Sequence, residues 1–205
     1  MRQFEEVKII YDRIFENLNG YGPSLLEKQQ RISEEYIKDL LYGEISIYLL
    51  YALFVLEPTS VYMDRGGIFY DLGSGIGNVV IGSYLIGNFR KYIGIEILDS
   101  LYEISLVARE NLCSIYKEAA GAVNFLQGNM LNFDISDGDL LLFCCPSGND
   151  EIRFRMEEKF LTLKKGAVIF SLIHVFKNNS DFTLVDSKIV KTAWGTAPLR
   201  IYEKI

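Results

Sequence analysis

The fold of this chain is decided by the stretch Ile68-Phe-Tyr-Asp-Leu-Gly-Ser-Gly-Ile-Gly-Asn78 and by Lys91-Tyr-Ile-Gly-Ile-Glu96, which follows it. In each stretch an apolar run carries an acid near its end, and the first run turns through three glycines at alternate positions. Short apolar runs predict buried strands, and glycines let the backbone turn tightly and approach a ligand. The pair predicts a strand–turn–helix–strand unit that binds an adenosine-containing cofactor, with Glu96 accepting hydrogen bonds from ribose hydroxyls.

The glycine spacing indicates which cofactor binds. A dinucleotide fingerprint has the spacing G-x-G-x-x-G. Here Gly73, Gly75 and Gly77 are followed by Asn78, so the third glycine comes one residue early. A carboxylate at Asp71 would repel a pyrophosphate but suits the ammonium group of S-adenosylmethionine. With the downstream acid, this pattern resembles class I S-adenosylmethionine-dependent methyltransferases. The alternative is a glycine turn that only tightens a strand-to-helix junction.

Composition narrows the class of protein. The chain has 205 residues, 49% of them hydrophobic, and a net charge of −6, which fits an α/β domain and argues against a free-standing nucleic-acid binder. Residues Met1–Glu6 lack a signal-peptide pattern, and the longest apolar stretch, Ile45–Leu56, is too short to span a bilayer. Cys113, Cys144 and Cys145 lack metal-binding spacing. We therefore expect no metal, no disulfide framework and a reducing setting, nucleus or cytoplasm.

Helices are expected throughout the first sixty residues. Apolar residues at three- and four-residue steps predict a helix over residues 4–18. Ser24-Leu-Leu-Glu27 matches a capping box, which predicts a second helix from Ser24 to about Leu40. Tyr42-Gly43-Glu44 interrupts this pattern, and a third helix is expected after it, running to about Glu57. Residues 1–60 would then form a helical segment, and residues 61–205 the cofactor-binding domain.

The rest of the chain alternates short apolar runs with helical patterns. Strands are expected at residues 68–72, 91–96, 122–127, 139–144, 166–172, 182–190 and 199–202, and helices at 76–87, 100–118 and 151–163. This alternation predicts a Rossmann-like class I methyltransferase fold, with a mostly parallel seven-stranded sheet covered by helices on both faces. The last two strands are expected to form a closing hairpin.

Further candidate residues follow the later strands. After the third strand, Asn129 can hydrogen-bond an adenine edge and Met130 can pack on its face; the alternative is an ordinary polar turn. After the fourth strand, Cys144 or Cys145 could act as a nucleophile, as in enzymes that methylate a cytosine carbon; the alternative is a small buried side chain. Trp194 is either part of the core or part of a channel for an alkyl-ammonium acceptor.

The segment Tyr42-Gly43-Glu44 interrupts two predicted helices. One interpretation is a loop in which Gly43 permits a tight backbone turn and the residues beside it expose polar groups. The alternative is a simple helix junction, with Glu44 in a favourable position near the start of the next helix.

Three segments in combination resemble the disruptor-of-telomeric-silencing family, the histone lysine methyltransferases that lack a SET domain. They are Leu41-Tyr-Gly-Glu-Ile-Ser46, Phe69–Val80 and Gly94-Ile-Glu96, and the tail Ala193-Trp-Gly-Thr-Ala-Pro198 is a weaker match. The resemblance runs from about residue 41 to the end of the chain.

The resemblance implies that residues 42–45 form a loop closing over S-adenosylmethionine. It places the methionine part of the cofactor at residues 69–78, the ribose at Glu96 and the adenine at Asn129 and Met130. The expected cofactor-binding residues are Tyr42, Gly43, Glu44, Ile45, Asp71, Gly73, Ser74, Gly75, Gly77, Asn78, Glu96, Asn129 and Met130, and the candidate catalytic residues are Tyr42, Glu44, Cys145 and Trp194.

The chain also departs from the family pattern. The family usually has Asp-Phe where this chain has Asn129-Met130, and Asn-Asn before an aromatic where it has Cys144-Cys145-Pro146. The flanking basic region that grips nucleosomal DNA is missing, as it is from compact archaeal and mitochondrial lysine methyltransferases that share this core. These departures argue against a histone substrate more than they argue against methyl transfer to a lysine.

The combined expectation is a protein-lysine N-methyltransferase that uses S-adenosylmethionine and acts on a protein substrate. It would bind neither nucleic acid unaided nor a membrane. An apolar channel would lower the acceptor lysine's pKa from about 10.4, and water would take the proton. The alternatives are a methyltransferase for RNA or a small molecule, and an inactive cofactor-binding module. The oligomeric state stays open.

Overall fold

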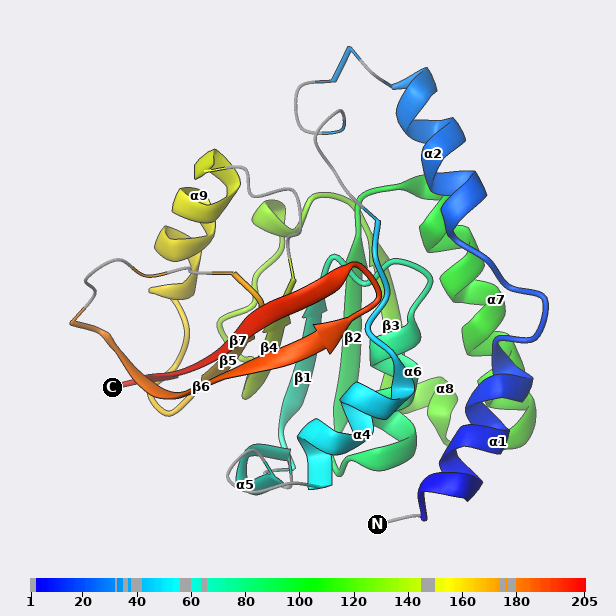
Figure 1. Ribbon diagram of the computed structural model, residues 1–205, viewed down its shortest axis with the longest axis horizontal. Coiled ribbons are helices and arrows are strands. Elements are labelled where there is room, and N and C mark those ends of the chain that lie inside the picture. The colour runs from blue at the N-terminus through cyan, green and yellow to red at the C-terminus, as the bar shows by residue number, and fades with distance from the viewer. Residues whose placement is uncertain are drawn as a thin grey trace.

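The computed structural model describes residues 3–31, 33–34, 37, 42–55, 60–63, 66–144, 150–173, 176 and 180–205. In this part of the chain a 7-stranded sheet has the order β3-β2-β1-β4-β5-β7-β6 (Figure 1). Its strands are β1 (Ile68–Leu72), β2 (Lys91–Glu96), β3 (Val123–Gln127), β4 (Leu140–Phe143), β5 (Val168–Ser171), β6 (Phe182–Thr192) and β7 (Gly195–Lys204).

The strand pairing is the one expected for a class I methyltransferase fold. Strands β1 to β5 pair in parallel, and β7 enters antiparallel between β5 and β6. The β6–β7 hairpin is confirmed but longer than predicted, because β7 begins at Gly195 rather than Leu199. Glycine and proline in Gly195–Pro198 obscured this part of the strand, although Pro198 pairs with Ile189.

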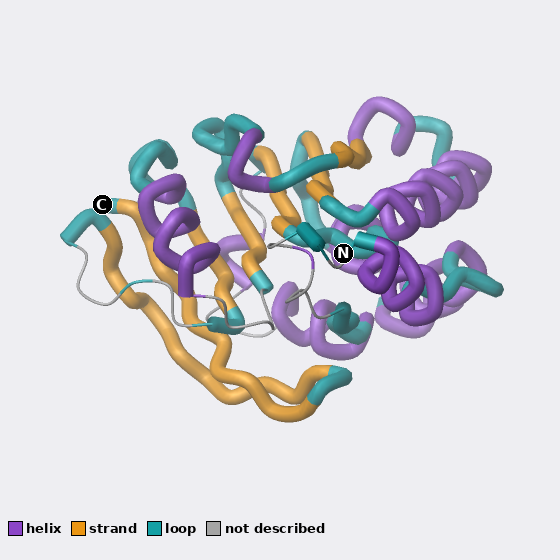
Figure 2. The backbone as a smooth tube through the Cα atoms, turned by 90° about the horizontal axis from the view of Figure 1, so that it is seen from above, coloured by secondary structure: helices purple, strands orange, loops and turns teal. Residues whose placement is uncertain are grey.

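Helices cover both faces of the sheet, as the alternating pattern predicted (Figure 2). Buried residues of α1, α4, α6 and α7 form one hydrophobic cluster with one sheet face, whereas α9 packs on the other. The elements are α1 (Phe4–Ile14), α2 (Tyr21–Gln30), α4 (Ile47–Val55), α5 (Ser60–Met63), α6 (Asn78–Ile86), α7 (Asp99–Ile115), α8 (Ala119–Ala122), the 3-10 helix η1 (Met130–Asn132) and α9 (Asp150–Phe160). The α5, α8 and η1 turns were not predicted.

The predicted capping box at Ser24 is wrong. Helix α2 begins at Tyr21, whose backbone N–H donates to the Oδ1 of Asn19 at 2.9 Å. The hydroxyl of Ser24 instead donates to the carbonyl of Tyr21 at 2.9 Å. The helix therefore starts before the box, with Gly20 at its N-cap position. The predicted continuation to Leu40 falls largely outside the described residues.

The third predicted helix is present as α4, which starts at Ile47, after the Tyr42-Gly43-Glu44 interruption. The hydroxyl of Ser46 accepts a hydrogen bond from the Leu49 N–H at 3.2 Å, which caps the helix there. Residues 42–46 are therefore an extended loop. The division of the chain at residue 60 stays a prediction, although α1 and α4 share one hydrophobic cluster with the sheet. Within the described residues, no helix has the length and apolarity needed to cross a membrane.

Candidate active site

A cavity of about 120 Å³ lies at the carboxyl ends of the parallel strands, where an open α/β sheet binds its ligands. Every expected cofactor-binding residue except Gly77 lines it. The described lining residues are Tyr42, Gly43, Glu44, Ile45, Asp71, Leu72, Gly73, Ser74, Gly75, Asn78, Val79, Ile95, Glu96, Ile97, Leu98, Leu101, Gly128, Asn129, Met130, Leu131, Leu142, Cys144 and Ile152.

The glycine-rich turn after β1 forms one wall of this cavity and requires its glycines. Gly75 has a φ of +54°, and a Cβ there would lie 2.7 Å from the ring of Tyr42. Gly77 has a φ of +89° and lies outside the lining, where a Cβ would lie 2.5 Å from the ring of Phe125. Gly77 therefore shapes the entry into α6 and packs against β3.

Asp71 and Ser74 present polar groups that lack partners within the described residues. Asp71 lies in β1, and its side chain is almost fully enclosed, with 4% of the residue exposed. Burial, and secondarily the charge of Glu96, raises the pKa of Asp71 well above its ordinary value. The Ser74 hydroxyl is also buried without a partner. An unpaired acid and an unpaired hydroxyl from residues of the same cavity lining fit the ammonium and carboxylate of an amino-acid ligand such as the methionine part of S-adenosylmethionine.

Glu96 ends β2 and is 6% exposed. Its Oε2 accepts a hydrogen bond from the N–H of Gly75, and its Oε1 accepts one from the N–H of Leu98, both at 2.8 Å. Burial raises the pKa of Glu96, while these backbone hydrogen bonds oppose the rise. The acid thus holds the glycine turn in place, a role the sequence did not indicate. Each carboxylate oxygen keeps a second lone pair for a ribose hydroxyl.

The Tyr42-Gly43-Glu44 loop covers the glycine turn. The Tyr42 hydroxyl donates to Oε1 of Glu44 at 2.6 Å, and its ring lies against Gly75. The same ring meets the edge of Tyr21 at 5.0 Å between centroids. Burial, followed by the hydrogen bond with Glu44, raises the pKa of Tyr42 far above its ordinary value. Tyr42 is therefore a hydrogen-bond donor at neutral pH and no proton acceptor.

Trp194 lies in the turn between β6 and β7, outside the cavity lining, with 39% of the residue exposed. Its indole covers Gly43 so closely that a Cβ at Gly43 would lie 2.5 Å from its Cε3. The turn of the hairpin therefore packs against the 42–45 loop. A channel for an acceptor at Trp194 stays a prediction.

Three other expected residues, Asn78, Asn129 and Met130, also line the cavity. The amide of Asn78 donates to the hydroxyl of Tyr11 on α1 at 2.9 Å. The Oδ1 of Asn129 accepts from the N–H of Leu131 at 2.9 Å and caps η1, so its amide N–H groups and the second lone pair of Oδ1 are available to an adenine. Met130 begins η1 and lines the cavity.

Cys145 lies outside the described residues, while its neighbour Cys144 lines the cavity. Sequence reasoning found Ile45 and Met130 but missed most of the apolar lining. Ile97 and Leu98 directly follow Glu96, so their position at a strand end offered a signal. Ile152 comes from α9, far along the chain, and no local pattern marks it.

Among the described residues, no group of three His, Cys, Asp or Glu side chains is placed to hold a metal ion.

Comparison with protein families gives one match over most of the chain. A family model described as histone methylation protein DOT1 matches residues 26–204. A protein-lysine N-methyltransferase of Saccharolobus islandicus is 30% identical over 119 residues, covering 57% of this chain and 67% of that protein.

A fungal relative aligns over more of the chain but is much longer. The H3 lysine-79-specific histone-lysine N-methyltransferase of Gibberella zeae is 24% identical over 196 residues, which is 90% of this chain. The aligned region spans only 38% of the fungal protein. Among solved structures, an RNA methyltransferase of Salinibacter ruber in complex with S-adenosyl-L-homocysteine has a TM-score of 0.51 and 25% identity, covering 73% of this chain and 94% of that one.

Proposed function

Because the chain belongs to the family of the histone methylation protein DOT1, we propose that it transfers a methyl group to the side-chain amine of a lysine in a protein. The chain is a class I S-adenosylmethionine-dependent methyltransferase, as the glycine spacing predicted. One observation carries the finer proposal of a lysine acceptor: the Saccharolobus relative, 30% identical, is a protein-lysine N-methyltransferase.

In this proposal the residues of the chain mainly bind the cofactor and align it with the acceptor. When bound, S-adenosylmethionine supplies a methyl group activated by its sulfonium. Asp71 pairs with the ammonium of the cofactor, and Glu96 accepts hydrogen bonds from its ribose. The 42–45 loop excludes water from the glycine turn beneath Tyr42. Alignment of donor and acceptor in a water-poor site supplies most of the acceleration of an in-line transfer.

The acceptor amine has to lose its proton before it attacks. Apolar residues beside the glycine turn, including Leu142 and Ile152, disfavour the charged ammonium and lower the lysine pKa from about 10.4. No histidine or lysine is among the described lining residues, Tyr42 is held protonated, and Glu44 already accepts the hydroxyl of Tyr42. We therefore assign the final proton acceptor to water.

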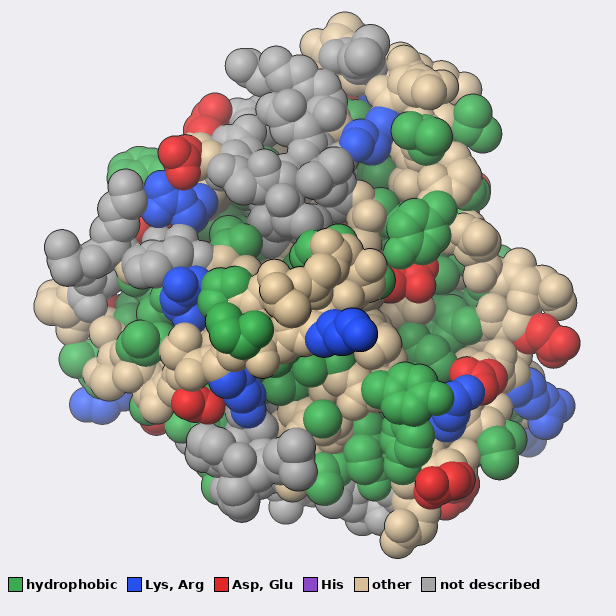
Figure 3. Space-filling view, in the orientation of Figure 1, with side chains coloured by type: hydrophobic (Ala, Val, Ile, Leu, Met, Phe, Trp, Pro, Cys, Tyr) green, Lys and Arg blue, Asp and Glu red, His purple; other side chains and the backbone are tan. Residues whose placement is uncertain are grey.

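Charge bears on which protein carries the lysine. Duplex DNA is gripped through several Lys or Arg contacts to phosphates. The chain has a net charge of −6, and on the face shown in Figure 3 the Lys and Arg side chains lie apart, between acidic and uncharged groups. We therefore propose a lysine on a histone delivered by a partner, or on another protein, in the nucleus or cytoplasm.

RNA is the second candidate acceptor. The observation that favours it is the likeness to the Salinibacter ruber RNA methyltransferase at 25% identity. The acidic charge of the chain weighs against it, because RNA binding also draws on cationic contacts.

The test is transfer of labelled methyl groups from S-adenosylmethionine into four separate pools: free histones, intact nucleosomes, total protein extract and total RNA. The Glu96→Gln variant is the matched control, since it keeps the shape of the side chain and removes its charge. Methyl-lysine found by mass spectrometry supports the proposal. Label in RNA alone would establish the second candidate instead. Binding of S-adenosylhomocysteine without transfer to any pool would favour an inactive module.

A further inference from the structure

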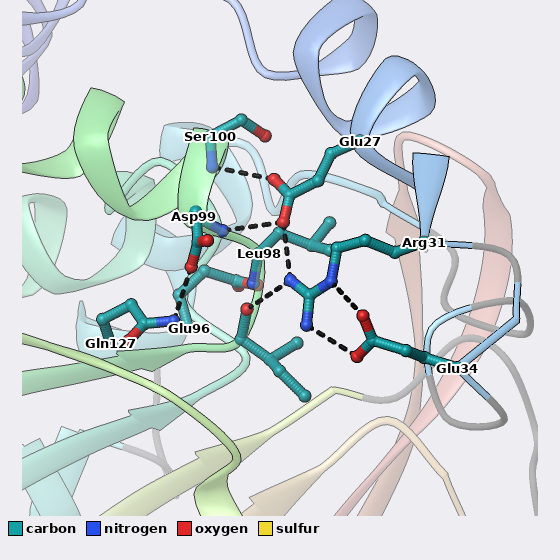
Figure 4. A network of polar contacts seen from close by, with 9 residues as sticks. Glu27, Arg31, Glu34, Glu96, Leu98, Asp99, Ser100 and Gln127 are labelled. Carbon is teal, nitrogen blue, oxygen red and sulfur yellow. Dashed lines mark hydrogen bonds and ion pairs between the residues drawn. The ribbon is translucent and has the colours of Figure 1, made fainter. Parts of the chain in front are cut away.

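A polar network outside the cavity joins α2 to the turn that follows Glu96 (Figure 4). Glu27, on α2, points at the first residues of α7. Its Oε1 accepts a hydrogen bond from the N–H of Asp99 at 3.0 Å, and its Oε2 accepts one from the N–H of Ser100 at 2.8 Å. These partners lie more than seventy residues along the chain. Glu27 therefore caps a helix to which it is not adjacent in sequence.

Helix α7 depends on this distant cap. The residue at its N-cap position is Leu98, which has no side-chain oxygen and makes no capping hydrogen bond. A helix start leaves backbone N–H groups without partners inside the helix, and a carboxylate there also interacts favourably with the helix dipole. Glu27 supplies the acceptors and adds its negative charge to that of Asp99 in the first turn.

Arg31 holds Glu27 in position and reaches the same turn. Its Nη1 donates to Oε1 of Glu27 at 2.7 Å and to the carbonyl of Ile97 at 3.4 Å. Its Nε and Nη2 bind the two carboxylate oxygens of Glu34 at 2.8 and 2.9 Å. Partial burial works to raise the pKa of Glu27, but hydrogen bonds from Ser100, Arg31 and the backbone outweigh it, so the pKa lies below its usual value.

The network meets the cofactor site at Glu96. The N–H of Leu98 donates to Oε1 of Glu96, while the neighbouring carbonyl of Ile97 accepts from Arg31 and the next two N–H groups donate to Glu27. Every residue of the turn from 97 to 100 thus has a backbone group held by this network or by Glu96. Leu98 donates to Glu96 from within this turn, so the network holds in place one of the two backbone N–H groups that orient the carboxylate; the other is that of Gly75.

We propose that Glu27 is a positioning residue for the cofactor site: through the capped turn at residues 97–100 it aims the Glu96 carboxylate at the cofactor ribose. The inference rests on the role proposed above for Glu96. It does not depend on the identity of the methyl acceptor. Helix α2 is accordingly part of the cofactor-binding machinery and not only an outer layer of the fold.

The test measures binding of S-adenosylhomocysteine by calorimetry to the full chain. Glu27→Ala removes both capping bonds and should weaken binding about tenfold, while Glu27→Gln keeps one acceptor oxygen and should lose less. Glu34→Gln is the matched control, because Glu34 also binds Arg31 but touches no residue of the turn; its side chain is 51% exposed against 11% for Glu27. Its affinity should stay within about twofold of wild type.

A double-mutant cycle with Glu96→Gln distinguishes positioning from a general loss of stability. If Glu27 acts through Glu96, its removal should cost much less affinity once Glu96 is already altered. Additive losses, or unchanged affinity in both folded Glu27 variants, would overturn the proposal. If Glu27→Ala does not fold, the cycle is run with Glu27→Gln. Because no acceptor is used, failure of the lysine proposal leaves this result unaffected.

Discussion

Replacing Asp71 by asparagine should stabilise the cofactor-free protein and weaken cofactor binding at the same time. Asp71 is 4% exposed and has no hydrogen-bond partner among the described residues. Its ionised form is therefore costly without a cationic ligand. Asparagine keeps the shape and removes the charge, although its own amide is left unpaired. We expect a net gain in the free energy of unfolding of about 1–2 kcal/mol at pH 8, or a Tm increase of roughly 2–8 °C.

The sign of the pH dependence follows from the raised pKa of Asp71. Below its ordinary pKa of 3.8 the carboxyl is protonated in both the folded and the unfolded protein, so wild type and variant should be similar. As the pH rises toward and through the raised pKa of the folded state, wild type loses stability and the variant does not. The Tm difference between Asp71→Asn and wild type should therefore grow with pH.

The affinity of Asp71→Asn for the cofactor should fall, whereas its stability should rise. Loss of a charge-assisted hydrogen bond to the ligand ammonium is expected to weaken S-adenosylhomocysteine binding by about 10- to 100-fold. Thermal melts between pH 4 and pH 8, followed by calorimetric titration, measure both effects. Asp12→Asn, which removes an exposed acid paired with Lys8, is the control and should change neither quantity appreciably. A variant less stable than wild type at pH 8 would show that the buried Asp71 carboxylate is not costly without a ligand. Unchanged affinity would show that Asp71 does not bind the cofactor.

Three further predictions concern the loop over the glycine turn. Gly75→Ala places a side chain at a positive φ and against the Tyr42 ring. It should lower the free energy of unfolding by about 1–3 kcal/mol, measured with denaturant, and weaken S-adenosylhomocysteine binding. Wild-type stability and affinity would mean that the ring moves freely. Trp194→Ala uncovers Gly43 and should speed hydrogen exchange of residues 42–45 with little change in Tm, whereas unchanged exchange would leave the indole without a role in the loop. Hydrogen exchange of the same residues in wild type should slow when S-adenosylhomocysteine is added, and maximal protection beforehand would instead identify a rigid junction.

The sequence by itself determined the part of the fold that depends on short-range pattern. The bounds of β1 and β2 are those predicted, because an apolar run between polar turns leaves few alternatives for a buried strand. The glycine spacing and Asp71 indicated S-adenosylmethionine for a chemical reason that needs no knowledge of distant residues. The Leu41–Ser46 and Phe69–Val80 motifs, together with Gly94-Ile-Glu96, were enough to indicate the family.

Tertiary structure decided how these pieces act on one another. Glu27 was assigned to a local capping box but caps α7 instead, because packing of α2 against α7 brings it within 3.0 Å of Asp99. Sequence alone left Trp194 either in the core or in an acceptor channel, and its contact with Gly43 arises because the hairpin is long enough to reach the 42–45 loop. Such contacts join residues far apart in the chain. Their energies depend on distances that only the packed fold sets, so no local pattern records them.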